Sequence, residues 1–177
     1  MNLNRLILQT HSLTISTIQE IVEKWNTFMQ EQEIYQKIGE LLWLIMPQEA
    51  TVIYFTGTIY PEHQSWITNF TLKNSNQYTF DLGQEPTNIE MKIKDLVNDL
   101  KELDTFAEKW THYKITLTEE GKINFDFAYI LEEDSWVSLL MRGISDLSED
   151  ELNRDYSQIP RELWEERVKL KAKNTNL

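Results

Sequence analysis

The chain has 177 residues and no cysteine, and its 29 acidic and 17 basic side chains give a formal net charge of −12. This length suits one domain with an appendage, and the absence of cysteine excludes disulfides, thiolate metal sites and cysteine nucleophiles. The shortage of Lys and Arg argues against binding to a nucleic-acid backbone, and only five glycines leave little room for a phosphate-binding loop. These numbers are typical of a compact acidic protein that meets a basic partner.

Nothing in the sequence predicts a targeting or membrane segment. The longest strictly apolar run, residues 41–46, is far shorter than the roughly 20 residues that span a bilayer. The N-terminus lacks the long apolar stretch and the small-residue cleavage site of a signal peptide. We therefore expect a cytoplasmic protein that binds neither a membrane nor nucleic acid.

The first 46 residues are predicted to be helical. Apolar residues recur every three or four positions over residues 14–28 and again over residues 34–45, and Pro47 ends the second series. Polar residues 30–33 interrupt the spacing, so we expect a helix break within residues 29–33. Residues 1–30 are accordingly predicted to be an N-terminal helical extension, and residues 31–177 a single domain.

Strand patterns follow. Residues 51–60, residues 65–73 and the region of Tyr78 and Phe80 are rich in β-branched or aromatic side chains and are separated by short turns. Thr87 is the expected N-cap of a long amphipathic helix, with Glu90 in the capping-box position. We expect this helix to reach Leu103 and to continue toward Phe106 and Trp110.

The hairpin signal is strongest over residues 113–129, where apolar and polar residues alternate on both sides of a turn that contains Gly121. This alternation places Asp126 on the outward side. The remainder is predicted to be helical, with residues 136–144 mostly apolar, Ser148 as an N-cap and Pro160 opening a last helix. The whole is an α+β fold: a mainly antiparallel sheet of about five strands with helices on one face, an extra N-terminal helix and a helical C-terminus.

The sequence contains no recognisable catalytic, cofactor or metal site. His11, His63 and His112 are isolated, and no serine lies in a nucleophile motif. The acidic runs 132–134 and 149–151 could hold Mg²⁺ or Ca²⁺ through oxygen, but they lack the alternate spacing and the glycine of a calcium loop. We interpret them as a solvated loop and a helix start, and predict no catalytic residue, no metal and no cofactor.

The negative charge is uneven along the chain. Residues 119–155 contain eleven acidic and three basic side chains, a balance of −8, whereas residues 161–177 have a balance of +2. A solvated acidic surface needs no partner, but an acidic field also attracts a cationic protein and orients its docking. An inhibitor of a cationic nuclease is therefore expected to be acidic.

Several short motifs resemble those of the YezG-like antitoxins, bacterial immunity proteins encoded beside secreted polymorphic toxins that are often nucleases. Residues 33–40 (EIYQKIGE), followed by Met46-Pro47, resemble the family's opening I-Y-x-x-I-(G/A) and M-I-P. Val52-Ile53-Tyr54 resembles its V-Y strand. Further matches are the Trp-Thr pair and the hairpin F-x-L-x-x-x-G-K-x-x-x-x-F-D-Y, represented here by Trp110, Thr111, Gly121, Lys122, Phe125, Asp126, Phe127 and Tyr129.

The resemblance covers roughly residues 31–130, and the chain departs from the family elsewhere. The first 28 residues are an addition, residues 135–167 match only loosely, and Ala50-Thr51 stands where the family has a Trp after M-I-P. The resemblance implies a non-catalytic antitoxin that binds a basic nuclease domain stoichiometrically, as a monomer in a 1:1 complex, in contact-dependent growth inhibition.

The acidic block and the aromatic content of binding hot spots predict where that toxin would bind. The expected toxin-binding residues are Glu119, Glu120, Glu132, Glu133, Asp134, Trp136, Glu149, Asp150 and Glu151. Two alternatives stay open at this point: a hydrolase that uses clustered carboxylates with a divalent metal, and a chaperone or adaptor that holds a secreted protein before export.

Overall fold

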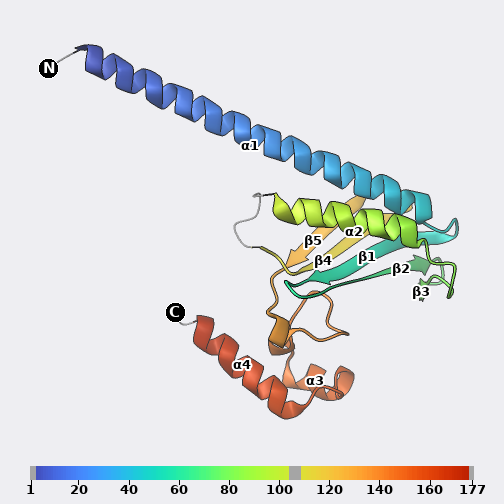
Figure 1. Ribbon diagram of the computed structural model, residues 1–177. Helices are drawn as coiled ribbons and strands as arrows, with labels where there is room; N and C mark the ends of the chain where they lie inside the picture. Colours follow the sequence, from blue (N-terminus) through green and yellow to red (C-terminus); the bar gives the residue numbers. More distant parts are fainter. Residues whose placement is uncertain (1–2, 104–108, 176–177) are drawn as a thin grey trace.

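The computed structural model describes residues 3–103 and 109–175, with side chains described for residues 15–103 and 109–173. Its elements in chain order are α1 (Leu3–Ile45), β1 (Ala50–Ile59), β2 (Gln64–Leu72), β3 (Gln77–Thr79), α2 (Thr87–Glu102), β4 (His112–Thr118), β5 (Ile123–Ala128), the 3-10 turns η1 (Glu132–Asp134) and η2 (Ile144–Asp146), α3 (Glu149–Asp155) and α4 (Arg161–Thr175) (Figure 1). The predicted α+β class is confirmed.

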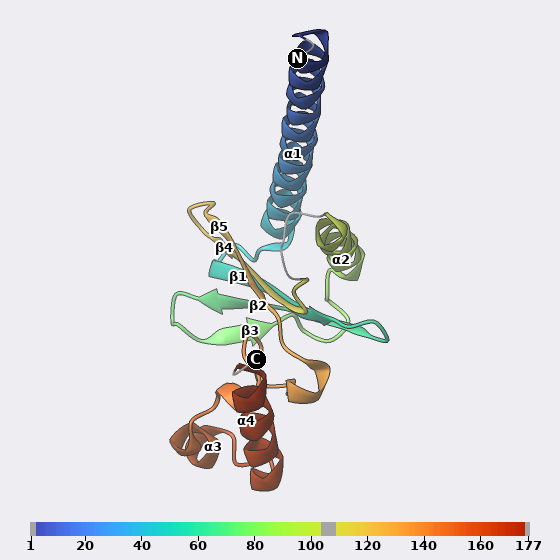
Figure 2. The ribbon, with the colours of Figure 1, turned by 90° about the vertical axis from the view of Figure 1, so that its left-hand side faces the viewer.

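The five strands form one antiparallel sheet in the order β3-β2-β1-β4-β5. Directly opposed residues share a face of an antiparallel sheet, and Phe55 of β1 is paired with Thr68 of β2 and Ile115 of β4. That face is covered by α1 and α2, as Figures 1 and 2 show from two sides. The predicted hairpin is confirmed: Gly121 lies in the β4–β5 turn with φ +77°, and Asp126 is exposed.

The main hydrophobic core lies between this face and the two helices. α1 contributes Ile34, Ile38 and Leu42, and α2 contributes Ile93, Val97 and Leu100. Gly57 has a packing role, since a Cβ on this residue would collide with the Ser65 carbonyl oxygen and the Tyr113 ring. The glycine therefore lets the buried Tyr113 side chain lie across β1. We call residues 31–135 the sheet domain.

The chain after β5 passes to the other side of the sheet and forms the C-terminal lobe, residues 136–173 (Figure 2). This lobe has its own small core, in which Trp136, Tyr156, Leu163 and Trp164 pack on fully buried aliphatic residues: Leu139, Ile144, Leu147, Leu152 and Ile159. Ser148 caps α3, since its hydroxyl accepts from the Glu151 N–H, as predicted. The predicted helix over residues 136–144 is wrong. Residues 136–143 form turns and a Trp136–Leu139 bridge, and Ile144 begins η2. Trp136, Leu139 and Ile144 pack in the lobe core whereas Val137 and Leu140 stay exposed, so the apolar residues do not share one buried helical face.

The predicted helix break is also wrong, because α1 runs without interruption from Leu3 to Ile45. Polar residues 30–33 interrupt the apolar pattern but are good helix formers, so the backbone continues. The part of α1 before residue 31 projects away from the sheet domain (Figure 1). We call it the overhang.

Two boundaries of α2 also differ from the prediction. Thr87 is the first helical residue rather than the N-cap, and its hydroxyl lies 3.5 Å from the Glu85 carbonyl oxygen. Pro86 occupies the N-cap position without a side-chain cap, which the preset φ of proline allows. The helix ends at Glu102. Phe106 lies outside the described residues, and Trp110 is buried in the main core beyond the helix.

Candidate protein-binding surface

The acidic residues expected to form one binding surface lie in three places. Glu119 and Glu120 are exposed in the β4–β5 turn, residues 132–134 form η1 after the other end of β5, and residues 149–151 begin α3. A six-residue strand spans about 20 Å, so the first two groups are separated by the length of the hairpin. The fold therefore distributes the acidic block instead of gathering it.

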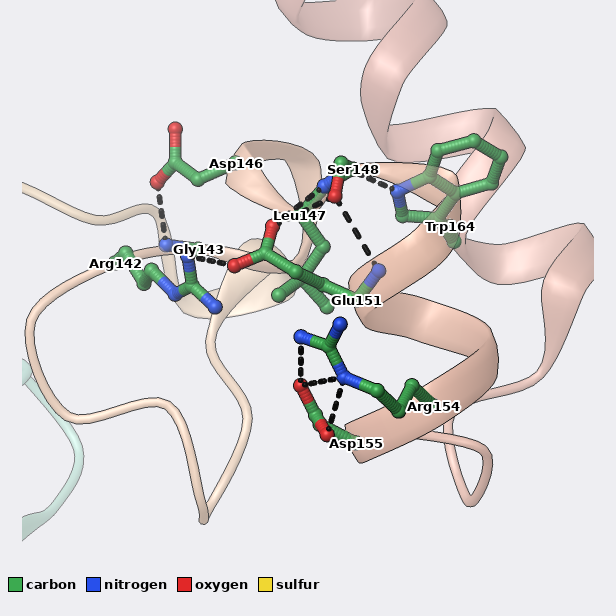
Figure 3. Close-up of polar contacts among 9 residues, drawn as sticks. All are labelled: Arg142, Gly143, Asp146, Leu147, Ser148, Glu151, Arg154, Asp155 and Trp164. Atoms are coloured by element: carbon green, nitrogen blue, oxygen red, sulfur yellow. Dashed lines mark hydrogen bonds and ion pairs between the residues drawn. The ribbon is translucent and has the colours of Figure 1, made fainter.

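The carboxylates of the C-terminal lobe are mostly paired within the lobe (Figure 3). Glu151 lies 2.9 Å from the Arg142 guanidinium and accepts from both the N–H and the hydroxyl of Ser148. The Ser148 N–H, followed by Arg142, lowers the pKa of Glu151 to about 2. Further ion pairs join Glu149 to Arg161, Asp155 to Arg154 and Asp146 to Lys171. These carboxylates thus hold the lobe together.

The lobe as a folded unit is almost neutral. Residues 136–173 contain eight acidic and seven basic side chains, a net charge of −1. The sheet domain contains nineteen acidic and eight basic side chains, a net charge of −11, and residues 1–30 sum to zero. The sheet domain therefore carries nearly all of the negative charge that a basic partner would meet.

Within the sheet domain, η1 and the residues around it combine charge with exposed apolar surface. We call residues 129–140, which include the first residues of the lobe, the η1 loop. Glu133 is exposed, and Glu132 lies 3.4 Å from the His63 ring. Tyr129, Leu131 and Leu140 are exposed apolar side chains, and Val137 is 98% exposed. Exposed apolar side chains beside charged groups are typical of protein interfaces.

Two predicted site residues of this loop have structural contacts. The Asp134 carboxylate accepts from the Ser145 N–H at 2.9 Å and from its hydroxyl at 2.6 Å, and a Cβ on Gly143 would collide with it. Trp136 is half-buried against the lobe core. Both residues therefore fix the loop, while Glu132 and Glu133 remain accessible.

The η1 loop borders three open concavities of about 600, 610 and 750 Å³. The first is also lined by Lys101 and Lys109, and the second by Arg167 and Lys171. The third lies against the polar face of the sheet, between Thr56 and Val137. The electrostatic character at the loop is therefore mixed, with acidic side chains on the loop and basic ones on the walls of two concavities.

The exposed apolar residues of this loop were not among the predicted binding residues. Tyr129 was assigned to the alternating hairpin, and Val137 and Leu140 to the predicted helix over residues 136–144. Leu131 belonged to no pattern, so none of the four was predicted to be part of a binding surface. The available signal was an irregular apolar run directly after a strand and interleaved with acids.

One buried histidine joins the sheet to the η1 loop. His112 Nε2 lies 3.4 Å from the Ser135 hydroxyl, and Nδ1 lies 3.2 Å from the Thr111 hydroxyl. Burial, helped by the nearby Lys101 charge, lowers the pKa of His112 to about 4, so the ring is neutral at physiological pH. Among the described residues, the polar contacts of this ring are with the hydroxyls of Thr111 and Ser135, and the Ser135 contact links β4 to the η1 loop.

No group of three or more potential ligands close enough to hold a metal ion occurs among the described residues. In the same part of the chain, no helix is both long and apolar enough to cross a membrane.

Two comparisons with known proteins give the same family for this chain. The immunity protein YezG of Bacillus subtilis strain 168 is 28% identical over 109 residues, which cover 55% of this chain and 72% of that protein. The family described as "Immunity protein YezG-like" matches residues 31–145, a stretch that contains the whole sheet domain, including η1, and the rest of the η1 loop. The match includes the hairpin and the helix motifs that carry the resemblance in the sequence, and the chain belongs to the YezG-like immunity protein family.

Proposed function

We propose that this protein neutralises a cognate toxin domain, a nuclease, by binding it stoichiometrically in the cytoplasm with one toxin domain per chain. The observation that carries this proposal is the family match over residues 31–145, which contains the whole sheet domain with its net charge of −11. The proposed mechanism is occlusion or distortion of the toxin's active site and requires no catalysis.

Electrostatics supports a nuclease as the target. A nuclease domain holds nucleic acid through Lys and Arg, so its binding face is cationic. Residues 119–135 of the sheet domain contain six acidic side chains and one basic side chain. An acidic surface of this kind raises the association rate with a basic partner and orients the encounter.

The η1 loop is the proposed centre of the toxin interface. Glu132 and Glu133 supply charge, Tyr129 and Val137 supply exposed apolar area, and Asp134 together with His112 holds the backbone in place. Glu119 and Glu120 are proposed to steer the encounter from the far end of the hairpin. Because Glu149 and Glu151 are themselves paired with Arg161 and Arg142, the acids of residues 149–151 are proposed to contribute least to the interface.

The division of the chain stays part of the proposal. We assign residues 1–30 to an extension and residues 31–177 to one domain, and the family match begins at residue 31 in support of that boundary. The C-terminal lobe then acts as a support for the η1 loop, because Trp136 and Asp134 anchor the loop to it.

The first experiment is co-expression with the toxin domain encoded by the neighbouring gene. We expect rescue of growth and a complex with one toxin domain per chain on a sizing column. Growth arrest without a complex would contradict the proposal.

A matched pair of charge reversals then locates the interface. Glu132→Lys/Glu133→Lys and Glu119→Lys/Glu120→Lys change the net charge equally but at opposite ends of the hairpin. We expect the η1 pair to slow association about tenfold at low salt and to weaken rescue, with a smaller effect from the turn pair. Equal effects of the two pairs would mean that total charge, and not the η1 loop, determines binding. Asp134 is left unchanged because its substitution would remove the hydrogen bonds to Ser145 that hold the loop in place.

Two other functions remain to be tested against this one. A metal-dependent hydrolase predicts heat release on titration with millimolar Mg²⁺, Mn²⁺ or Ca²⁺, and calorimetry without binding would count against it. A secretion chaperone predicts preference for an unfolded or extended segment, whereas the proposed immunity protein binds the folded toxin domain.

A further inference from the structure

The overhang of α1 carries an unpartnered apolar stripe. Its members are large apolar side chains of which 43–62% is exposed: Ile15, Ile18, Ile21, Val22, Trp25, Phe28 and Met29. Together they expose on the order of 600–700 Å² of mostly apolar surface, more than the few hundred Å² that monomers usually leave in one patch. Helices that lack tertiary packing are also marginal in water, so a helix of this kind is stabilised by a partner.

The stripe is not an extension of the face that packs on the sheet. Helical residues turn by about 100° each, so Val22 and Ile38 point roughly 160° apart around the helix axis. Ile34, Ile38 and Leu42 face the core, and the stripe faces the opposite side. The chain's own sheet domain therefore cannot cover the stripe while α1 stays straight.

The charge of the overhang distinguishes between possible partners. Its polar side chains from residue 15 to residue 30 include only three charges, and the Glu20 and Lys24 pair is joined by a 2.8 Å ion pair. An anionic membrane is bound by helices with several Lys or Arg on the polar face, whereas residues 15–30 contain Lys24 as their single basic side chain. A basic toxin is attracted by the sheet domain with its charge of −11 rather than by a neutral helix. A second neutral apolar helix is the matching surface.

We propose that two copies of this chain associate through their overhangs as an antiparallel helix pair. The stripe is nearly symmetric about Val22, with Ile18 and Trp25 on either side and then Ile15 and Met29. A two-fold axis near Val22 brings apolar side chains against apolar side chains at every turn and sets the large Trp25 beside the smaller Ile18. The area per chain approaches the roughly 800 Å² that each partner contributes to a standard interface.

Charge favours the antiparallel direction over the parallel one. A parallel pair would place two sheet domains, each with a net charge of −11, at the same end. In an antiparallel pair centred at Val22 the two domains begin about 27 Å apart, at a rise of 1.5 Å per residue. This is several times the screening length of about 8 Å at physiological ionic strength, so the repulsion is largely removed.

Light scattering of the full chain after size exclusion tests the association without any toxin. We expect a mass twice the 21.1 kDa of the chain. Ile18→Glu/Trp25→Glu should return the mass to that of one chain, and Ile18→Leu/Trp25→Leu should keep the dimer. The control Leu44→Glu/Leu82→Glu makes the same change at two exposed apolar residues outside the stripe and should also keep it. A wild-type mass of one chain would overturn the proposal.

Cysteine cross-linking tests the direction of the pair, and the absence of native cysteine makes each introduced thiol the only one. Val22→Cys lies near the proposed two-fold axis and should form a disulfide-linked dimer on mild oxidation. Met29→Cys should remain uncross-linked, because the two copies of residue 29 would be about 20 Å apart along the antiparallel pair. Cross-linking of Met29→Cys as efficient as that of Val22→Cys would show parallel pairing and overturn the antiparallel arrangement.

Two outcomes would assign the stripe to another partner. If the wild type has the mass of one chain and Ile18→Glu/Trp25→Glu abolishes toxin binding, the stripe is part of the toxin interface. If the single chain instead sediments with vesicles of anionic phospholipid, it is a membrane contact. The proposed dimer predicts neither result. Because its mass is measured without toxin, the test of the dimer is independent of the toxin-binding proposal.

Discussion

The sheet domain and the C-terminal lobe are both rich in acidic residues along the sequence, yet they use them differently. In the lobe, Glu149, Glu151 and Asp155 are each held by an arginine, and the net charge is −1. In the sheet domain, acidic side chains outnumber basic ones by eleven. An acidic stretch of sequence therefore predicts an acidic surface only if few basic side chains from other parts of the chain pair with it in the folded protein.

The two regions also differ in how they are stabilised. The sheet domain buries a large core between two helices and four strands, whereas the lobe has a small aliphatic cluster supported by caps and ion pairs. Small cores supply little hydrophobic stabilisation, so we expect the lobe to be the less stable region. Four changes, ordered from the largest expected effect to the smallest, test this difference.

The largest effect is expected from Phe55→Ala in the central strand. Phe55 is fully buried against Tyr113 with ring centroids 6.0 Å apart, so its truncation leaves a cavity. The expected loss is about 3–5 kcal/mol of unfolding free energy for the whole molecule. Chemical denaturation followed by tryptophan fluorescence and far-UV circular dichroism measures it, and a loss below about 1 kcal/mol would contradict this description of the core.

Leu152→Ala makes the corresponding change in the lobe. Leu152 is buried at the centre of the lobe cluster, and we expect a loss of about 2–4 kcal/mol that is confined to the lobe. Hydrogen exchange should show lost protection over residues 136–171 with β1 and β4 unchanged. If the sheet amides lose protection equally, the lobe and the sheet domain unfold as one unit.

His112→Gln tests the link between the sheet and the η1 loop. The folded pKa of His112 is lowered to about 4 by burial, while the unfolded value is near 6.5. Between these values the unfolded chain binds a proton that the folded chain does not, so the histidine makes stability fall as the pH decreases from about 6.5 to about 4. The variant should remove on the order of 3 kcal/mol of that pH dependence.

Urea denaturation of both proteins at several pH values in this window measures the difference. Parallel stability curves for the wild type and His112→Gln would mean that the ring titrates normally and is not enclosed as described.

The smallest effect is expected from Ser148→Ala at the start of α3. Loss of the capping hydroxyl, which accepts from the Glu151 N–H, should cost about 1 kcal/mol of lobe stability. Ser138→Ala is a suitable control, because Ser138 is exposed and its hydroxyl lies at a long 3.5 Å from the Gln158 amide nitrogen. Equal effects of the two substitutions on lobe protection would contradict the role of the cap.

Local signals predicted the strands, the hairpin with Gly121, the Ser148 cap and the antiparallel α+β class, because each depends on residues close together in the sequence. The helix break at residues 29–33 and the Thr87 cap were predicted wrongly from equally local signals. In the first case the apolar pattern changes because α1 packs on the sheet only after residue 31, and the helix itself continues. In the second case Pro86 already starts the helix, so Thr87 is placed one position inside it.

The candidate surface was predicted only in part. Glu132 and Glu133 are accessible as expected, but Asp134 makes structural hydrogen bonds with Ser145 that no spacing reveals. The bonds between Glu151 and Ser148 follow the capping-box spacing, and yet Glu151 was predicted as a toxin-binding residue. The Arg161 and Lys171 partners of the lobe carboxylates come from a helix that follows them in the chain. Such pairing depends on how α4 packs, which is a long-range property.

The sequence by itself determined the charge, the element types and the family motifs, since composition and short-range periodicity are properties of the chain. Only the tertiary structure decided which acids are neutralised, which apolar residues of the η1 loop stay exposed, and that the two apolar faces of α1 point in opposite directions. The physical reason is that burial and ion pairing depend on contacts between distant residues, whereas helical and strand propensities act over a few neighbours.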